Sequence, residues 1–211
     1  MSGSAVTGHG VLLAGGAGSR LGFAKPSAEL GGRPLIDYPL TAMRDAGLAV
    51  TIVAKRGSEL PAQCLSDGRD WPRPNVIREP DAPLHPLLGI ATALELLDSP
   101  AVFCACDMPF VTSALLAWIA GLDEANVAVP RRGEVVDSLI GRYTPGALPE
   151  LRAALDAGGS ARSAVECAGL RAISEAELAR FGTPARLLFD VDTPEDLELA
   201  TRMIELNRSA E

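Results

Sequence analysis

Short apolar runs alternate along the chain with segments whose apolar residues recur at helical spacing. Runs rich in Val, Ile, Leu and Ala are typical of strands buried on both faces, and the amphipathic segments between them are typical of covering helices. Strands are predicted at residues 11–14, 50–53, 76–77, 101–105, 127–129, 139–143 and 187–189, and helices at 34–46, 87–97, 113–122, 148–155, 161–168 and 194–207. The alternation predicts an α/β fold, a three-layer αβα sandwich around a mostly parallel, Rossmann-like sheet.

The length of 211 residues suits one α/β domain with a single core. Residues 1–8 are small and polar, and we expect them to form a flexible leader before a domain at residues 9–211. No repeat, low-complexity tract or linker divides the rest of the chain. Thr112 or Ser113, and Thr193 later in the chain, are expected N-caps of two of the predicted helices.

Composition argues against several functional classes. The net charge of −8 and the aromatic content of 4% disfavour a nucleic-acid partner, because nucleic-acid binding favours a basic face and stacking aromatics. No apolar run approaches the roughly 18 residues of a membrane span, and the first residues lack the features of a secretory signal. The cysteines do not form the paired C-x-x-C spacing of zinc sites, so we expect reduced thiols and a cytoplasmic protein.

A glycine-rich loop after the first predicted strand is the main chemical signal, with Gly15, Gly16 and Gly18. Glycine lets a backbone approach a ligand closely, and successive N–H groups in such a loop form a concave site for an anion. Arg20 and Lys25 follow. The segment therefore predicts a loop that wraps a polyphosphate and two exposed cations that neutralise it. The alternative is a surface turn with two solvated cations, which the buried strand in front of the loop disfavours.

Two better-known phosphate-binding loops do not fit this segment. A Walker A loop has Ser or Thr after its Gly-Lys pair, whereas Lys25 stands between Ala24 and Pro26. The dinucleotide fingerprint G-x-G-x-x-G would need glycine at Leu21. The second predicted strand also ends in basic residues and not in the acid that would bind a ribose. The loop belongs to neither class.

Carboxylates follow two later segments at positions suited to a metal ion. Asp107 closely follows the strand predicted at 101–105. Because ligands of open α/β sheets bind at the carboxyl ends of the strands, we expect Asp107 near the glycine loop. Mg²⁺ commonly binds one or two carboxylates together with phosphate oxygens. Asp107 is therefore the predicted Mg²⁺ ligand, with Asp192 or Asp190 as the second. The alternatives are a helix cap for the first and a turn for the other two.

These groups together predict nucleotidyl transfer, in which an acceptor phosphate oxygen attacks the α-phosphate of a nucleoside triphosphate and pyrophosphate leaves. This reaction needs positioning and charge neutralisation more than a protein base. Arg20, Lys25 and Asp107 are the predicted catalytic residues, because they would hold the triphosphate and the metal ion. Of the two histidines, His9 is expected on the surface, and a role for His85 in its proline-rich loop is left open.

Four segments carry a resemblance to a known family. They are L-A-G-G at 13–16 followed by Lys25, P-L-L-G at 86–89, C-A-C-D-M-P at 104–109 and D-T-P-E-D-L at 192–197. With them the chain resembles nucleotidyltransferases of the sugar-nucleotide type, and within these the molybdenum cofactor guanylyltransferases. The likeness runs from about residue 10 to residue 200.

The resemblance implies a fold of the nucleotide-diphospho-sugar transferase type, with residues 9–211 as a MobA-like nucleotidyltransferase domain. It implies transfer of GMP from GTP to the phosphate of molybdopterin, with Mg²⁺ as cofactor and molybdoenzymes or cofactor-pathway proteins as partners. The implied nucleotide-binding residues are Leu13, Ala14, Gly15, Gly16, Gly18, Ser19, Arg20, Lys25, Glu79 and Asp107. Asp107 and Asp192 would bind the metal ion.

The chain departs from the family at two positions near the nucleoside. Val53 stands where the family often has Asn, and Glu79 stands where it usually has Asp. Gly15 agrees with the guanylyl members, since cytidylyl relatives tend to have alanine there. Two alternatives remain: a related transferase that uses CTP or another acceptor, such as a sugar phosphate, and a non-catalytic nucleotide-binding domain.

Overall fold

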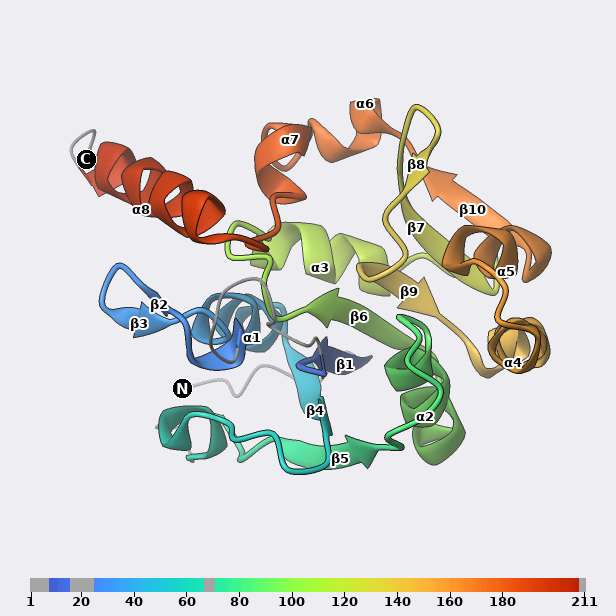
Figure 1. The fold of residues 1–211 in the computed structure, drawn as a ribbon. Coiled ribbons are helices and arrows are strands. Elements are labelled where there is room, and N and C mark those ends of the chain that lie inside the picture. Colours follow the sequence, from blue (N-terminus) through green and yellow to red (C-terminus); the bar gives the residue numbers. More distant parts are fainter. Residues whose placement is uncertain (1–7, 16–24, 67–70, 209–211) are drawn as a thin grey trace.

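The centre of the molecule is a mostly parallel sheet. A computed structural model describes residues 8–15, 25–66 and 71–208. The strands are β1 (Gly8–Leu13), β4 (Leu48–Lys55), β5 (Asn75–Glu79), β6 (Ala101–Ala105), β7 (Val127–Arg132), β8 (Val135–Val136), β9 (Gly141–Tyr143) and β10 (Leu170–Ile173). Their order across the sheet is β10-β7-β9-β6-β1-β4-β5, with β8 paired to β7. β1 is parallel to β4 and β6, whereas β9 is antiparallel to both of its neighbours (Figure 1).

The central strands β1 and β6 are apolar on both faces. In β1, Leu12 packs into one hydrophobic cluster and Val11 into another on the opposite side of the sheet. Cys104 and Phe103 divide between the same two clusters in β6. Because side chains alternate along a strand, a strand covered on both sides needs an uninterrupted apolar run. The two strands predicted from such runs are therefore confirmed, although β1 begins earlier than expected, at Gly8.

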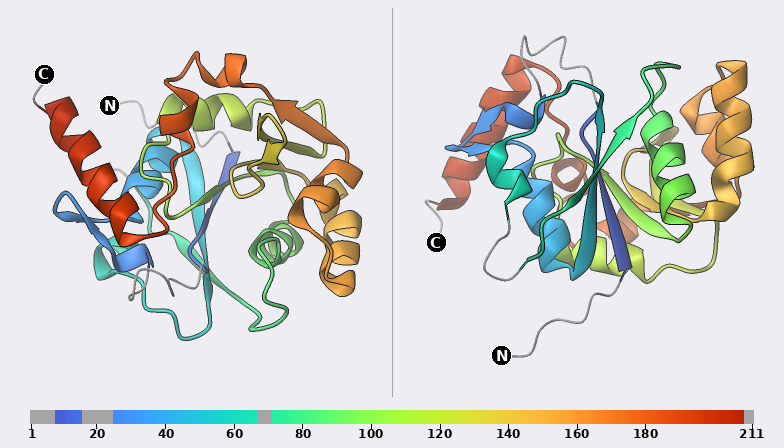
Figure 2. Two further views of the ribbon diagram at one scale, coloured as in Figure 1. Left: turned by 45° about the horizontal axis from the view of Figure 1, so that its top comes forward. Right: turned by 90° about the horizontal axis from the view of Figure 1, so that it is seen from below.

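Helices cover both faces of the sheet (Figure 2). One layer contains α1 (Asp37–Asp45), α3 (Ser113–Ala120), α6 (Glu175–Leu178) and α7 (Pro184–Leu187), and the other contains α2 (Leu88–Leu97), α4 (Leu148–Ala157) and α5 (Ala161–Cys167). Short 3₁₀ helices lie at η1 (Lys25–Ser27), η2 (Ala62–Leu65) and η3 (Pro145–Ala147). The predicted three-layer αβα architecture is confirmed.

The last helix, α8 (Pro194–Arg208), packs on a small hairpin of β2 (Glu29–Leu30) and β3 (Arg33–Pro34). A third apolar cluster joins them and includes Leu30 of the hairpin and Ala200 of the helix. The predicted cap is present, because the Thr193 hydroxyl oxygen accepts the Asp196 N–H at 3.2 Å. The Thr112 hydroxyl caps α3 in the same way, accepting the Leu115 N–H. Local polar chemistry thus sets where these helices begin.

Two expectations about elements are corrected. The strand predicted at 187–189 is wrong: Leu187 ends α7, and this apolar run is buried as helix and turn because Pro184 opens a helical turn just before it. The first helix begins at Asp37 and not at Pro34, which pairs with Glu29 in the hairpin. The edge strand β10 was not predicted. Of the expected leader, only Gly8 lies within the described residues, and it belongs to β1.

Candidate active site

A cavity opens where the direction of strand order reverses. From β1 the chain continues through α1 to β4 on one side, and from β6 it continues through α3 to β7 on the other. Leu13 and Ala105 are partners in register at the carboxyl ends of the two strands. Such a switch point is where open α/β sheets bind their ligands. The cavity has a volume of about 480 Å³, and both residues line it.

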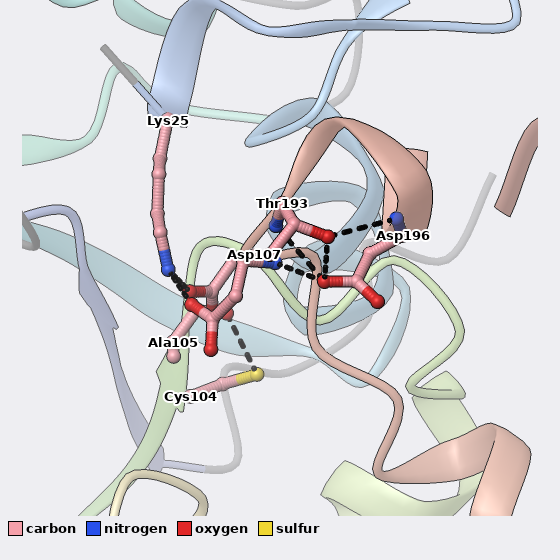
Figure 3. A network of polar contacts seen from close by, with 7 residues as sticks. Lys25, Cys104, Ala105, Asp107, Thr193 and Asp196 are labelled. Carbon is pink, nitrogen blue, oxygen red and sulfur yellow. Dashed lines mark hydrogen bonds and ion pairs between the residues drawn. The ribbon is translucent and has the colours of Figure 1, made fainter. Parts of the chain in front are cut away.

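An ion-paired cluster forms one side of this cavity. The Lys25 ammonium in η1 lies 2.6 Å from Asp107 Oδ2 and also contacts Asp192 Oδ1 (Figure 3). The side chains of Lys25 and Asp107 are only 12% and 14% exposed, whereas Asp192 is 41% exposed. Lys25 was expected as an exposed loop lysine, and that expectation is wrong. The cluster combines one cation with two carboxylates at the carboxyl end of β6.

The charge of Lys25 is maintained by its carboxylate partners. Burial alone would lower the pKa of the ammonium, because it disfavours the charged form. The charges of Asp107 and Asp192 and their hydrogen bonds outweigh this effect, so the pKa of Lys25 is raised. The lysine is therefore a permanent cation that faces the cavity at neutral pH.

Backbone contacts hold the two carboxylates beside each other. The Val191 N–H donates to the Asp107 carbonyl oxygen at 2.9 Å, which joins the end of β6 to the segment before α8. The Asp196 carboxylate then accepts the N–H groups of Asp192 and Thr193 at 3.1 and 2.9 Å. Asp196 thus positions the start of α8 and leaves the Asp192 side chain for the cavity. Asp190 lines the cavity as well, and desolvation together with the charges of Asp192 and Asp107 raises the pKa of its carboxyl group.

A buried carboxylate occupies the other side of the cavity. Glu79, at the end of β5, is 6% exposed. A Cβ atom built on Gly15 would lie 2.9 Å from Glu79 Cδ and closer still to Oε1, and one on Gly89 would lie 2.9 Å from Oε2. The carboxylate is therefore seated between two glycines that leave it room. Burial raises its pKa, and the charge of Lys55 acts in the opposite direction.

Of the predicted site residues that the structure describes, all except Ala14 line the cavity. Leu13, Gly15, Lys25, Glu79, Asp107, Asp190 and Asp192 all line the cavity. Ala14 does not: it is 2% exposed, and its N–H donates to the Val53 carbonyl oxygen. Gly16, Gly18, Ser19 and Arg20 lie outside the described residues. Their predicted roles stay predictions.

The cavity also contains residues that were not predicted as site residues. Lys55, at the carboxyl end of β4, is paired in register with Glu79 and lines the cavity. The strand-end rule that identified Asp107 would have found it, had the rule been applied to the second strand. His85 and the segment 136–140 line the cavity too. That segment follows a short edge hairpin, and its sequence carries no recognisable motif.

Fold and site together define a class of protein. A parallel α/β sheet with a lysine and paired carboxylates at its switch point is the arrangement of an enzyme that handles nucleotide phosphates. Residues 10–176 match the family model described as the MobA-like NTP transferase domain. The chain therefore belongs to the MobA-like NTP transferase family. The predicted membership of this family is confirmed, and so is the prediction that the protein is a nucleotidyltransferase.

Individual relatives agree with the family assignment. The chain is 28% identical to a probable molybdenum cofactor guanylyltransferase of Pelotomaculum thermopropionicum, with 95% of each chain covered. It is 30% identical to the molybdenum cofactor guanylyltransferase of Vibrio atlanticus, over 70% of this chain and 74% of that one.

Solved structures share the fold. The molybdopterin-guanine dinucleotide biosynthesis protein A of Archaeoglobus fulgidus matches with a TM-score of 0.75 and 24% identity, covering 93% of this chain and 98% of that one. The 2-C-methyl-D-erythritol 4-phosphate cytidylyltransferase of Thermus thermophilus matches with a TM-score of 0.65 and 19% identity, covering 93% and 98%. The predicted fold of the nucleotide-diphospho-sugar transferase type is confirmed. Within the part of the chain that the structure describes, no helix is long and apolar enough to cross a membrane.

Proposed function

We propose that the enzyme transfers GMP from GTP to the terminal phosphate of molybdopterin and releases pyrophosphate. The observation that carries this proposal is the contact of Lys25 with Asp107 on the cavity wall, at the carboxyl ends of the central strands. The names of the relatives support the choice of GTP and of a molybdenum cofactor precursor. The acceptor and the nucleotide are proposals drawn from these relatives and from the chemistry of the cavity.

The transfer is a displacement at the α-phosphorus of GTP. An oxygen of the acceptor phosphate forms a new bond to this phosphorus. The bond from the phosphorus to the oxygen that bridges to the β-phosphate breaks, and pyrophosphate leaves with that electron pair. A transfer of this kind depends on alignment and on stabilisation of the charge on the departing group.

Lys25 would exchange partners when the triphosphate binds. In the structure its ammonium is shared by two carboxylates, so its charge is already partly desolvated and held at the cavity wall. Charge-assisted contacts between an ammonium and phosphate oxygens are strong under such conditions. We propose that Lys25 binds the phosphates of GTP, whose negative charge would take the place of the two carboxylates in favouring the charged ammonium.

The donor set at this wall fits Mg²⁺. Asp107 and Asp192 both reach the same ammonium nitrogen, so their carboxylate oxygens lie close together. Among the residues described by the structure, no three His, Cys, Asp or Glu side chains form a group that could hold a metal ion. Mg²⁺ binds through one or two carboxylates and completes its shell with water and phosphate oxygens. Bound there, Mg²⁺ would supply positive charge at the α-phosphate.

The opposite wall suits the edge of a guanine. Guanine presents adjacent N1–H and N2–H donors and the O6 acceptor. The Glu79 carboxylate offers two acceptor oxygens, and Lys55, its partner in register, offers a cation. Gly15 and Gly89 leave the carboxylate its space. We propose that Glu79 accepts the two guanine donors and that Lys55 donates to O6.

A four-nucleotide comparison tests the proposal. Pyrophosphate release is measured with GTP, ATP, CTP and UTP in the presence of Mg²⁺ and molybdopterin. We expect kcat/KM for GTP to exceed that of each other nucleotide by at least about tenfold, because unpaired buried groups penalise the wrong base. Preference for CTP would contradict the guanylyl assignment alone. Absence of release with every nucleotide would contradict transfer to this acceptor, and replacing molybdopterin with sugar phosphates would then test the acceptor.

A further inference from the structure

Both ring nitrogens of His85 are engaged with backbone groups from different parts of the fold. Nδ1 lies 3.1 Å from the Leu87 nitrogen, whose N–H donates to it. Nε2 lies 2.8 Å from the carbonyl oxygen of Gly159, which is 74 residues away in sequence. Because an N–H must donate and a carbonyl must accept, these contacts require a neutral ring with its proton on Nε2. His85 is therefore committed to two backbone contacts and is not placed to move a proton in the cavity it lines.

The first of these contacts lies at the beginning of α2. Leu87 is the N-cap residue of this helix, and its own side chain makes no capping hydrogen bond. The N–H groups of the first turn lack partners within a helix, so an external acceptor helps to define where the helix begins. His85 provides two, since its ring accepts from Leu87 and its carbonyl oxygen accepts from Leu88 at 3.1 Å.

This first turn of α2 forms part of the nucleoside side of the cavity. Leu88 and Gly89 line the cavity, and Gly89 is one of the two glycines that seat the Glu79 carboxylate. A small shift of the turn would change the distance between Gly89 and Glu79. The position of the proposed base contact thus depends on a turn whose backbone is hydrogen-bonded to His85.

The second contact, with Gly159, joins the loop to a segment that is itself hydrogen-bonded to α4. Gly159 lies between α4 and α5, and its N–H donates to the Ala154 carbonyl oxygen at 2.8 Å. α4 packs against α2, so the hydrogen bond from His85 to Gly159 links the loop before α2 to a second helix of the same layer (Figure 1). Next to His85 in the loop, Leu84 is 80% exposed, whereas Leu87 is fully buried.

We propose that His85 is a positioning residue for nucleotide binding. By joining Gly159 to the first turn of α2 it sets the place of Gly89 and so the seat of Glu79. The effect on GTP rests on the function proposed above, whereas the effect on the first turn of α2 does not.

The test separates the two hydrogen bonds with two variants. His85→Ala removes both. His85→Asn keeps the acceptor for Leu87, because an Asn oxygen commonly accepts the N–H two residues on, but it is too short to reach Gly159. His9→Ala is the matched control, since His9 is exposed at the amino end of β1 and does not line the cavity.

Amide hydrogen exchange at residues 87–89 is measured by NMR, and kcat and KM for GTP are measured in parallel. In His85→Ala we expect exchange at Leu87 to rise by about tenfold and KM for GTP to rise several-fold with little change in kcat. In His85→Asn we expect exchange at Leu87 to return toward the wild-type rate, with an intermediate KM. His9→Ala should behave as wild type.

Each result decides the proposal. Unchanged exchange at residues 87–89 in His85→Ala would overturn it, and so would a fall in kcat at unchanged KM, which indicates a role in the chemical step. If His85→Ala does not fold, His85→Asn with wild-type KM and wild-type exchange at residues 87–89 would overturn it. A wild-type protein without GTP turnover would contradict the proposed function, and hydrogen exchange would then decide the role of His85 alone.

Discussion

Substitution of Gly15 by alanine tests whether the Glu79 carboxylate reads the base. The added Cβ would lie 2.9 Å from Glu79 Cδ, closer than such contacts occur, so one of the two groups must move. Gly15 does not adopt a positive φ, and its backbone therefore accepts alanine without strain. Because the atoms in the way are the end of a flexible side chain, we expect Glu79 to move while the fold is retained.

The size of the effect follows from the contact that is lost. Glu79 is 6% exposed, so its carboxylate lies almost entirely within the protein. The displaced carboxylate would lose its hydrogen bonds to guanine, and a hydrogen bond to a charged group is worth about 1.5–3 kcal/mol. We expect GTP affinity to fall by about 10- to 100-fold, and CTP affinity to change far less.

Calorimetric titration with GTP and CTP measures this change, with melting temperature as the check on folding. Gly121→Ala is the matched control, because its Cβ would meet only ordinary contacts of 3.5 Å and more. Gly15→Ala and Glu79→Gln are also combined. If the first acts through the second, the losses in GTP affinity will be less than additive. Full additivity, or an unchanged ratio of GTP to CTP affinity in Gly15→Ala, would refute the reasoning.

Three further predictions concern the charged groups of the cavity. Asp107→Asn should remain folded but lose at least about a hundredfold in kcat if Asp107 holds the metal ion and triphosphate. Turnover within tenfold of wild type at saturating Mg²⁺ would contradict this role. The control is Asp123→Asn, because Asp123 is exposed and does not line the cavity. Lys25→Ala should weaken GTP binding in calorimetry and also lower the free energy of unfolding by about 1–3 kcal/mol, since it leaves two carboxylates without their cation. Lys25→Arg should recover the stability. A melting temperature for Lys25→Ala equal to that of the wild type would show that the ion pairs contribute little to stability. Burial raises the pKa of Glu79 above 4.5, so the protonated carboxyl group favours the folded state, and this contribution to stability is lost as pH rises through the raised pKa. GTP affinity should show the opposite trend and fall as pH decreases through that pKa. Glu79→Gln should abolish this part of the pH profile of GTP affinity.

Much of the fold could be predicted because its determinants are local. β6 is an apolar run covered on both sides, and α8 begins where Thr193 and Asp196 cap it. The failures occur where the local pattern is compatible with two structures. The apolar run at 187–189 has no period that separates a strand from a buried helical turn, and the neighbouring sheet and helices decided between them.

The sequence by itself identified Gly15 after β1, the carboxylate of Asp107 after β6 and the family to which the chain belongs. A residue's type and its place at a strand end are local properties. Because ligands bind at the carboxyl ends of the strands in such sheets, residues at these ends are expected to share one site. Lys25 was part of that prediction, but as an exposed cation.

Only the tertiary structure decided which groups meet. Lys25 contacts Asp192, 167 residues away, and both are held at the cavity by the packing of α8. The seat of Glu79 needs glycines from the β1 loop and from α2, and the contact of His85 with Gly159 needs two helices to pack side by side. These pairs depend on strand order and helix packing, which no local pattern of residue types encodes. Burial then acts on the assembled groups: it raises the pKa of Glu79, whereas beside Lys25 the two carboxylates outweigh burial and raise the pKa of the ammonium.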